Sequence, residues 1–230
     1  MSECEDALAF NLDTLRFAVA DGATEAFDSR RWARVLARAW CRQDTVDDDE
    51  YGIAQAARTL GDRVSEKWQG KELSWFVEEK ARSGAFAAFL GLVVSQDGSW
   101  RATAIGDSCL FAEYEDELTC SFPLSSPEEF GSRPKLLPAR HAQYDDFADS
   151  IRRIRGTWAP GVRITMMSDA VSCWYLGHAA PEAALRDYFH SLLTASDDAA
   201  LRSLIAAERD AGRMRNDDVA ILRLDWTALT

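Results

Sequence analysis

Four acidic motifs stand at the ends of apolar, strand-like segments, where side chains from different strands can meet. They are Glu5-Asp6 before ALAF, Asp21-Gly22 after LRFAVA, Asp169 after VRITMMS, and Asp217-Asp218 before VAILRL. If these segments are antiparallel neighbours, strand ends lie beside strand starts and the carboxylates converge at one edge of a sheet. Clustered carboxylates repel one another unless a cation neutralises them, and hard divalent cations prefer oxygen ligands. The sequence therefore predicts a metal site.

A predicted β-hairpin brings the first two motifs together. Its strands are Ala7–Phe10 and Leu15–Ala20, joined by a turn over Asn11–Thr14. Counting back from that turn places Glu5-Asp6 roughly opposite Ala20-Asp21. The pairing makes the first cluster of carboxylates a consequence of the hairpin register.

The composition is typical of a folded protein that does not bind nucleic acid. The chain has 230 residues and 47% hydrophobic residues, enough for one packed domain, which we expect to span 1–230. The net charge of −12 argues against nucleic-acid binding, because affinity for the phosphate backbone comes from Lys and Arg.

The cysteines and the hydropathy favour a cytoplasmic location without membrane contact. The five cysteines are widely spaced and form no CxxC pair, so reduced thiols are the preferred interpretation over disulfides or zinc. No apolar segment is long enough to span a bilayer. None of the cysteines has a neighbour in sequence that predicts a lowered pKa.

Helical and strand periodicities alternate in blocks, which predicts an α+β fold with antiparallel sheet covered by helices. Helices are expected from Asp28 to Trp40, over Asp49–Glu66, over Asp146–Arg155, from Pro181 to Thr194, and from the capping residue Asp197 to Gly212. A four-stranded meander is expected over Ala85–Ser95, Ser99–Ile105, Ser108–Tyr114 and Leu118–Phe122, with later strands at Val162–Met167 and Val219–Asp225. Lys71–Arg82 is compatible with a helix end or a connection, and the proline-containing segment 123–145 is expected to form a loop or flap.

The order of the motifs resembles that of the PPM family, the metal-dependent or type-2C protein phosphatases, and of its bacterial members. The motifs are ED, ADG, an apolar strand after Ser83-Gly84, IGDS, SDA and NDD, and they cover nearly the whole chain. The resemblance implies two packed, mainly antiparallel sheets flanked by helices, an α-β-β-α sandwich. It also implies a Ser/Thr phosphoprotein phosphatase that uses two or three Mn²⁺ or Mg²⁺ ions. The implied partners are a phosphorylated protein and a Ser/Thr kinase that acts on the same targets.

The resemblance implies a role for each acidic motif. Asp21 would bridge two ions, and the Gly22 carbonyl and Glu5 would coordinate the second ion. Asp169 and Asp217 would complete the coordination of the first ion, and Asp107 in GDS would be a ligand of a third ion. Asp6 would hold the attacking water through an outer contact, so that Asp6 and Asp21 carry the catalytic roles.

The chain also departs from the family pattern in its accessory groups. No basic residue lies among Met1–Cys4, where members carry a phosphate-binding arginine shortly before ED. Ala23 stands where His or Met is frequent, Cys109 replaces an arginine after GDS, and Ala170 replaces a glycine after SD. Asp218 stands where Asn is common.

These departures leave three hypotheses open. The first is an active phosphoprotein phosphatase, the second is a pseudophosphatase of the same fold that acts as a regulatory binding module, and the third is a phosphohydrolase acting on a small molecule. The individual motifs also have structural interpretations. A DG or GDS segment forms a tight turn readily, and Arg152, Arg153 and Arg155 fit a solvated helix face better than a phosphoprotein contact.

Overall fold

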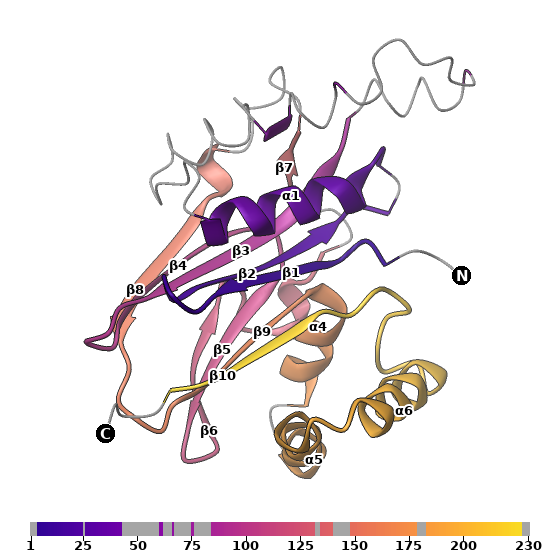
Figure 1. Cartoon of the computed structure of the whole chain (residues 1–230). Helices are drawn as coiled ribbons and strands as arrows, with labels where there is room; N and C mark the ends of the chain where they lie inside the picture. Colours follow the sequence, from indigo (N-terminus) through magenta and orange to yellow (C-terminus); the bar gives the residue numbers. More distant parts are fainter. Residues whose placement is uncertain are drawn as a thin grey trace.

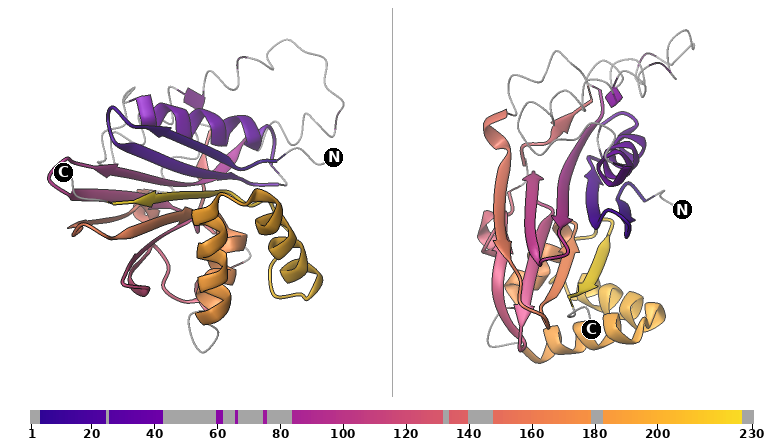
Figure 2. Two further views of the ribbon diagram at one scale, coloured as in Figure 1. Left: turned by 60° about the horizontal axis from the view of Figure 1, so that its bottom comes forward. Right: turned by 60° about the vertical axis from the view of Figure 1, so that its left-hand side comes forward.

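Two antiparallel sheets lie face to face, and helices cover the outer face of each (Figures 1 and 2). The computed structural model describes residues 4–24, 26–42, 60–61, 66, 75, 84–131, 134–139, 148–178 and 183–226. Within these ranges the layers run helix, sheet, sheet, helix, so the predicted α+β sandwich is confirmed.

The first sheet has the order β1-β2-β3-β4-β8, with β7 paired to one end of β3. The strands are β1 (Ala7–Asn11), β2 (Arg16–Gly22), β3 (Phe86–Val94), β4 (Ser99–Ile105), β7 (Leu137–Pro138) and β8 (Arg152–Thr157). Its outer face is covered by α1 (Ser29–Arg42) (Figure 1).

Strand β2 shows why this sheet is buried on both faces. Its side chains alternate, so that Ala18 and Ala20 pack under α1, whereas Phe17 and Val19 enter the core between the sheets. Small residues on the α1 side let the helix lie close, and a Cβ atom at Gly91 of β3 would come within 2.5 Å of the Trp40 ring of α1.

The second sheet has the order β10-β9-β5-β6 and is covered by three C-terminal helices (Figure 2). The strands are β5 (Cys109–Tyr114), β6 (Glu117–Phe122), β9 (Arg163–Met167) and β10 (Ile221–Asp225). The helices are α4 (Asp169–Gly177), α5 (Ala183–Ala195) and α6 (Asp198–Asp210). None of the helices in the described ranges is long and apolar enough to cross a membrane.

Several sequence predictions are confirmed with small shifts. The N-terminal hairpin forms, but Ala7 pairs with Ala20, so its register differs by one residue from the predicted one. The helix after Asp28 is α1, and the Asp197 side chain caps α6 by accepting a hydrogen bond from the Ala200 N–H at 3.0 Å.

The predicted four-stranded meander is wrong at its centre. Strands β3 and β4 pair in the first sheet, whereas β5 and β6 pair in the second, so the chain changes sheet at Gly106-Asp107. Apolar alternation cannot distinguish a hairpin turn from a connection between two packed sheets, because both core faces have the same period.

The predicted helix over Asp146–Arg155 is also wrong, because Arg152–Thr157 is the strand β8. This strand lies at the edge of its sheet and pairs with β4 alone, and charged side chains are common on such edges. Helix α4 was not predicted, because it is apolar on nearly every side and buried, and therefore lacks an amphipathic period.

Other predicted elements fall partly outside the described ranges. The expected helix Asp49–Glu66 is described only at Leu60, Gly61 and Glu66, which are helical, and Lys71–Arg82 only at Trp75. The segment 123–145 contains the 3-10 turn η1 (Pro127–Glu129) and strand β7 among its described residues.

Candidate metal centre

The predicted acidic residues lie together where the two sheets meet. Asp6 precedes β1, and the hairpin register places it opposite Asp21 near the end of β2. The carboxyl group of Asp21 lies close enough to those of Asp6 and of Asp169, at the start of α4, for each pair to interact. Asp107, in the connection between the sheets, lies close enough to interact electrostatically with Asp21 and Asp169.

Burial and mutual repulsion disfavour the ionised forms of these carboxyl groups. Burial, followed by the charges of Asp6 and Asp169, raises the pKa of Asp21 to about 10. Burial is also the main reason that the pKa of Asp6 and the pKa of Asp107 each rise to about 7. The pKa of Asp169 is raised by burial and by the charge of Asp217. Without a cation, the cluster is thus held partly protonated at neutral pH.

Two carboxylate oxygens in the cluster lack a protein partner. The buried Oδ2 of Asp6 and Oδ1 of Asp169 have no hydrogen-bond partner. Buried polar atoms are usually satisfied, so these two oxygens are available to a ligand. An all-oxygen donor set suits Mg²⁺ or Mn²⁺. Among the described residues, no group of three or more acidic, His or Cys side chains already stands in ligand geometry around one point, so binding requires these side chains to adjust.

Glu5 and Gly22 are held in the site by their main chains. The Glu5 N–H donates a hydrogen bond to Asp218 Oδ2 at 2.6 Å. A Cβ atom at Gly22 would lie 2.8 Å from the carbonyl carbon of Ser29 and 3.1 Å from the carbonyl oxygen of Glu5. The backbone of Gly22 is therefore packed between the start of α1 and the segment leading into β1, an approach that needs glycine.

Ser168 lies beside Asp6, and no pattern in the sequence predicted this contact. Its hydroxyl accepts a hydrogen bond from the Ala220 N–H at 3.0 Å, and it lies close enough to the carboxyl group of Asp6 to favour the ionised form of that group. Its main chain also pairs with Ala220. Ser168 thus joins the end of β9, the start of β10 and the lead into β1.

Two arginines that sequence reasoning missed contact the acidic motifs. Arg215 Nη1 lies 3.5 Å from Asp169 Oδ2, and its Nη2 donates to the Phe130 carbonyl at 3.0 Å. Arg209 of α6 donates to the main-chain carbonyl of Asp217. The position of Arg215, two residues before Asp217, was a signal available in the sequence. The contact of Arg209 depends on how α6 packs.

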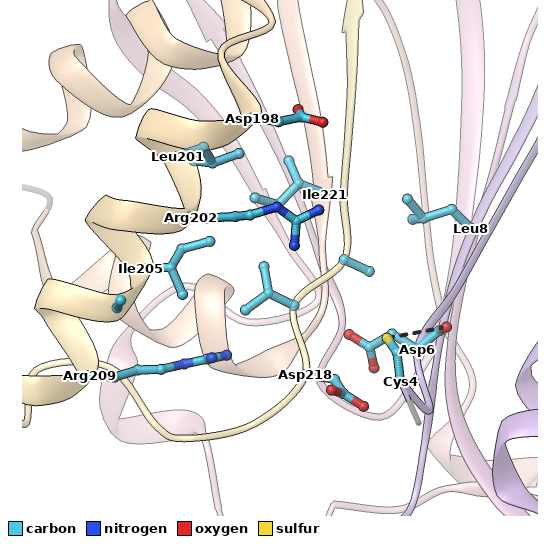
Figure 3. A pocket seen from close by; sticks show the side chains of 13 residues that line it. Cys4, Asp6, Leu8, Asp198, Leu201, Arg202, Ile205, Arg209, Asp218 and Ile221 are labelled. Atoms are coloured by element: carbon cyan, nitrogen blue, oxygen red, sulfur yellow. Dashed lines mark hydrogen bonds between the residues drawn. The ribbon is translucent and has the colours of Figure 1, made fainter. Parts of the chain in front are cut away.

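Asp217 and Asp218 form the rim of the site. Asp217 is exposed, and its Oδ1 accepts a hydrogen bond from the Asp218 N–H at 2.8 Å. Asp218 and Asp6 both line a cavity of about 810 Å³ beside α6 (Figure 3). The carboxylates are therefore reachable from solvent on this side.

The thiols do not offer an alternative nucleophile. Burial raises the pKa of Cys109, the cysteine after the GDS motif, to about 12, and it raises the pKa of Cys41 to the same range. Burial likewise raises the pKa of Cys4, Cys120 and Cys173. A thiol held in its protonated form is a poor nucleophile.

Comparison with solved structures identifies phosphatases of the same fold. The serine/threonine phosphatase PstP/Ppp of Mycobacterium tuberculosis has a TM-score of 0.62 at 17% identity, covering 99% of this chain and 94% of that chain. The PPM Ser-Thr phosphatase MsPP of Mycobacterium smegmatis has a TM-score of 0.60 at 16% identity, covering 98% and 93%. A catalytic domain of PstP solved with two manganese ions has a TM-score of 0.58 at 15% identity, covering 99% and 93%.

The sequence comparisons give a family but no near relative. A comparison with curated proteins finds no significant match. The family model for protein phosphatase 2C matches residues 2–207, which is most of the chain. Together with the two-sheet fold and the cluster of carboxylates where the sheets meet, this match shows that the chain belongs to the protein phosphatase 2C family.

Proposed function

We propose that this protein is a metal-dependent Ser/Thr phosphoprotein phosphatase. The observation that carries the proposal is the group formed by the buried Asp6 and the half-buried Asp21 and Asp169, with raised pKa values and two carboxylate oxygens without partners. Such a group is stabilised by divalent cations, and cations are the means by which members of this family hydrolyse phosphoesters. The solved PstP domain with two manganese ions supports the choice of metal.

The proposed ligands follow from the placement of the acidic motifs. Asp21 would be shared by both ions, Asp169 and Asp217 would hold the first, and Glu5 with the Gly22 carbonyl would hold the second. Asp107 is the proposed ligand of a third, weaker ion. When bound, a pair of such ions activates water near neutral pH and offsets the charge of the phosphate.

The remaining roles belong to protein groups around the ions. Asp6, which lies beside Ser168, would hold the attacking water in line with the phosphorus atom. Arg215 would bind the phosphate oxygens, because its side chain is 43% exposed and lies beside Asp169. This assignment provides a phosphate-binding cation from the segment that precedes Asp217.

The substrate would be a phosphorylated protein, and a Ser/Thr kinase that modifies the same protein would be the functional counterpart. We also propose a cytoplasmic site of action, as the composition suggests. Direct attack by water requires no thiol, which agrees with the raised pKa values of the cysteines.

The test is the metal dependence of p-nitrophenyl phosphate hydrolysis. Turnover should require Mn²⁺ or Mg²⁺, stop with EDTA, and be lost in Asp21→Ala. The matched control is Asp13→Ala, because Asp13 is an exposed acid at the opposite end of the same hairpin. Metal-independent turnover, or full activity of Asp21→Ala, would overturn the proposal.

A pseudophosphatase is the second candidate. It is favoured by Ala23 after Gly22, where members of the family often carry His or Met, and by the fully buried Cys109 after the GDS motif, where they carry an arginine. In that case calorimetry would detect Mn²⁺ binding, whereas no phosphopeptide or p-nitrophenyl phosphate would be hydrolysed. The two candidates share the metal site and differ only in turnover.

A further inference from the structure

The cavity beside the acidic cluster has a wall that none of the proposed catalytic roles uses. It is about 810 Å³ in volume and lies between α6, the start of β10 and the N-terminal strand (Figure 3). Asp6 and Asp218 line it at the end nearest the proposed metals. Any protein substrate that places a phosphoresidue on those acids must therefore lay its neighbouring residues near this cavity.

The walls combine apolar surface with one free cation. Leu8 of β1 is 45% exposed and faces the cavity, and α6 contributes Leu201 and Ile205 from the other side. Arg202 is exposed, and its guanidinium group points across the cavity from α6 (Figure 3). It forms no hydrogen bond or ion pair with any residue that the structure describes.

The two arginines of this wall, Arg202 and Arg209, differ in their contacts with the rest of the protein. Arg209 reaches the Asp217 carbonyl and so fixes the rim of the metal site. Arg202 lies two turns away, about 10 Å along the helix axis at 1.5 Å per residue. An extended peptide covers that length in about three residues. Asp198 also lines the cavity, one turn beyond Arg202, without pairing to it.

Arg202 is not the only exposed arginine without a partner among the described residues, since Arg34 of α1 also has none. Arg202 differs in its position, because it faces a cavity that adjoins the acidic cluster. A free guanidinium group next to apolar surface and close to the catalytic acids is complementary to an anionic side chain on a bound polypeptide.

We propose that this cavity selects the sequence around the phosphoresidue of the substrate protein. An acidic side chain about three residues from the phosphoresidue would pair with Arg202, and an apolar side chain between them would cover Leu8, Leu201 and Ile205. This inference rests on the proposed function, and it names the substrate class as phosphoproteins with an acidic residue near the phosphosite.

The test compares phosphothreonine peptides that differ only in the residue three positions before or after phosphothreonine, Asp or Lys. The wild-type enzyme should show a kcat/KM about three- to fivefold higher for the Asp peptide on one side, the range of an exposed ion pair. Arg202→Glu should reverse this preference. Its turnover of p-nitrophenyl phosphate should be unchanged, because that substrate is too small to reach Arg202.

Arg34→Glu is the matched control, because Arg34 is also exposed on a helix but lies on α1, against the other sheet. It should leave the peptide preference unaltered. An Arg202→Glu enzyme that hydrolyses p-nitrophenyl phosphate normally and keeps the wild-type peptide preference would overturn the inference.

The same experiments distinguish a failure of the phosphatase proposal from a failure of the peptide-recognition proposal. If the wild-type protein hydrolyses none of the substrates, the phosphatase proposal fails, and fluorescence polarisation with the same labelled peptides then decides the inference. Preferential binding of the Asp peptide that is reversed in Arg202→Glu supports the cavity as a recognition site. Equal binding of both peptides contradicts it.

Discussion

The main-chain N–H of Glu5 donates a 2.6 Å hydrogen bond to the side chain of Asp218, although the two residues are 213 positions apart. This bond joins the segment before β1 to the segment before β10, the edge strands of the two sheets. The first and last acidic motifs are thus held together across the sandwich. Their alignment depends on a carboxylate that is itself outside the proposed ligand set.

Removing the Asp218 carboxylate should therefore weaken metal binding indirectly. We expect Asp218→Ala to lower the Mn²⁺ affinity about 10- to 100-fold, the usual effect of losing a group that orients ligands. Asp218→Asn keeps an oxygen that can accept from the Glu5 N–H and should stay within a few-fold of wild type. Calorimetric titration with Mn²⁺ measures both. Equal affinity of Asp218→Ala and wild type would contradict a positioning role.

The metal-free protein should become less stable as pH rises. The folded pKa values of Asp6 and Asp107 (about 7) and Asp21 (about 10) lie above the ordinary value of 3.8. The stability that these groups contribute is fully present below pH 3.8 and is lost as pH rises through 7 and 10. With EDTA, the Tm should fall as pH rises from 5 to 9. The difference in Tm between the Mn²⁺-loaded and the metal-free protein should become larger over the same range. A metal-free Tm that stays constant or rises over this range would contradict the pKa shifts.

Gly22→Ala should damage the site through backbone displacement. The added methyl group would lie 2.8 Å from the Ser29 carbonyl carbon, so α1 or the segment of Glu5 must move. We expect a loss of stability of about 1–3 kcal/mol, as for other overpacking substitutions, together with weaker Mn²⁺ binding. Gly177→Ala is the control, because a Cβ atom there meets nothing within 4 Å. Denaturant unfolding and Mn²⁺ titration of both variants would show whether the effect is specific to Gly22.

Arg215→Ala should separate phosphate binding from metal binding. If Arg215 binds the phosphate, its loss should raise the inhibition constant of inorganic phosphate and the KM for phosphopeptides by about tenfold, the effect of one charge-assisted hydrogen bond of 1.5 kcal/mol. The Mn²⁺ affinity should not fall, because removing a cation 3.5 Å from Asp169 relieves competition for that carboxylate. Unchanged phosphate inhibition would remove Arg215 from the proposed site.

Glu113 anchors a buried ionic network that is separate from the metal site. Its carboxylate accepts hydrogen bonds from Arg163 and Arg186, each at 2.9 Å, and from Tyr175, and His190 lies within 2.9 Å. Burial opposes its ionisation, but these partners outweigh burial and lower its pKa to about 2.

Glu113→Gln should destabilise the fold by about 3–5 kcal/mol, because it leaves Arg186 buried without its counter-ion. The carboxylate contributes stability above its ordinary pKa of 4.5, and this contribution is lost as pH falls toward 2. Glu115→Gln, at an exposed site in the next turn, is the control. Urea unfolding at pH 7 measures both, and equal stability of the two variants would be evidence against the network.

The sequence predicted the strands that carry the acidic motifs, because local rules determine these strands. The hairpin register follows from a short turn, so the approach of Asp6 to Asp21 was foreseeable to within one residue. The strand before Asp169 and the strand after Asp218 were also predicted correctly, since buried strands are continuous apolar segments. Their pairing within one sheet then brings the two acidic motifs to the same edge.

The contacts that orient these acids depend on packing and were not predictable. Asp107 reaches the site because the chain changes sheet there, and Arg209 reaches Asp217 because α6 packs beside β10. Ser168 looked like an ordinary residue at a strand end. Tertiary arrangement, rather than periodicity, creates these three contacts.

The most direct test of the account is phosphate release from a phosphothreonine peptide as a function of Mn²⁺ concentration, with wild type and Asp21→Asn side by side. We predict saturable activation of the wild-type protein, none with EDTA, and a loss of more than about a hundredfold in Asp21→Asn. A wild-type protein that binds Mn²⁺ but releases no phosphate, or an Asp21→Asn protein that is activated normally, would contradict it.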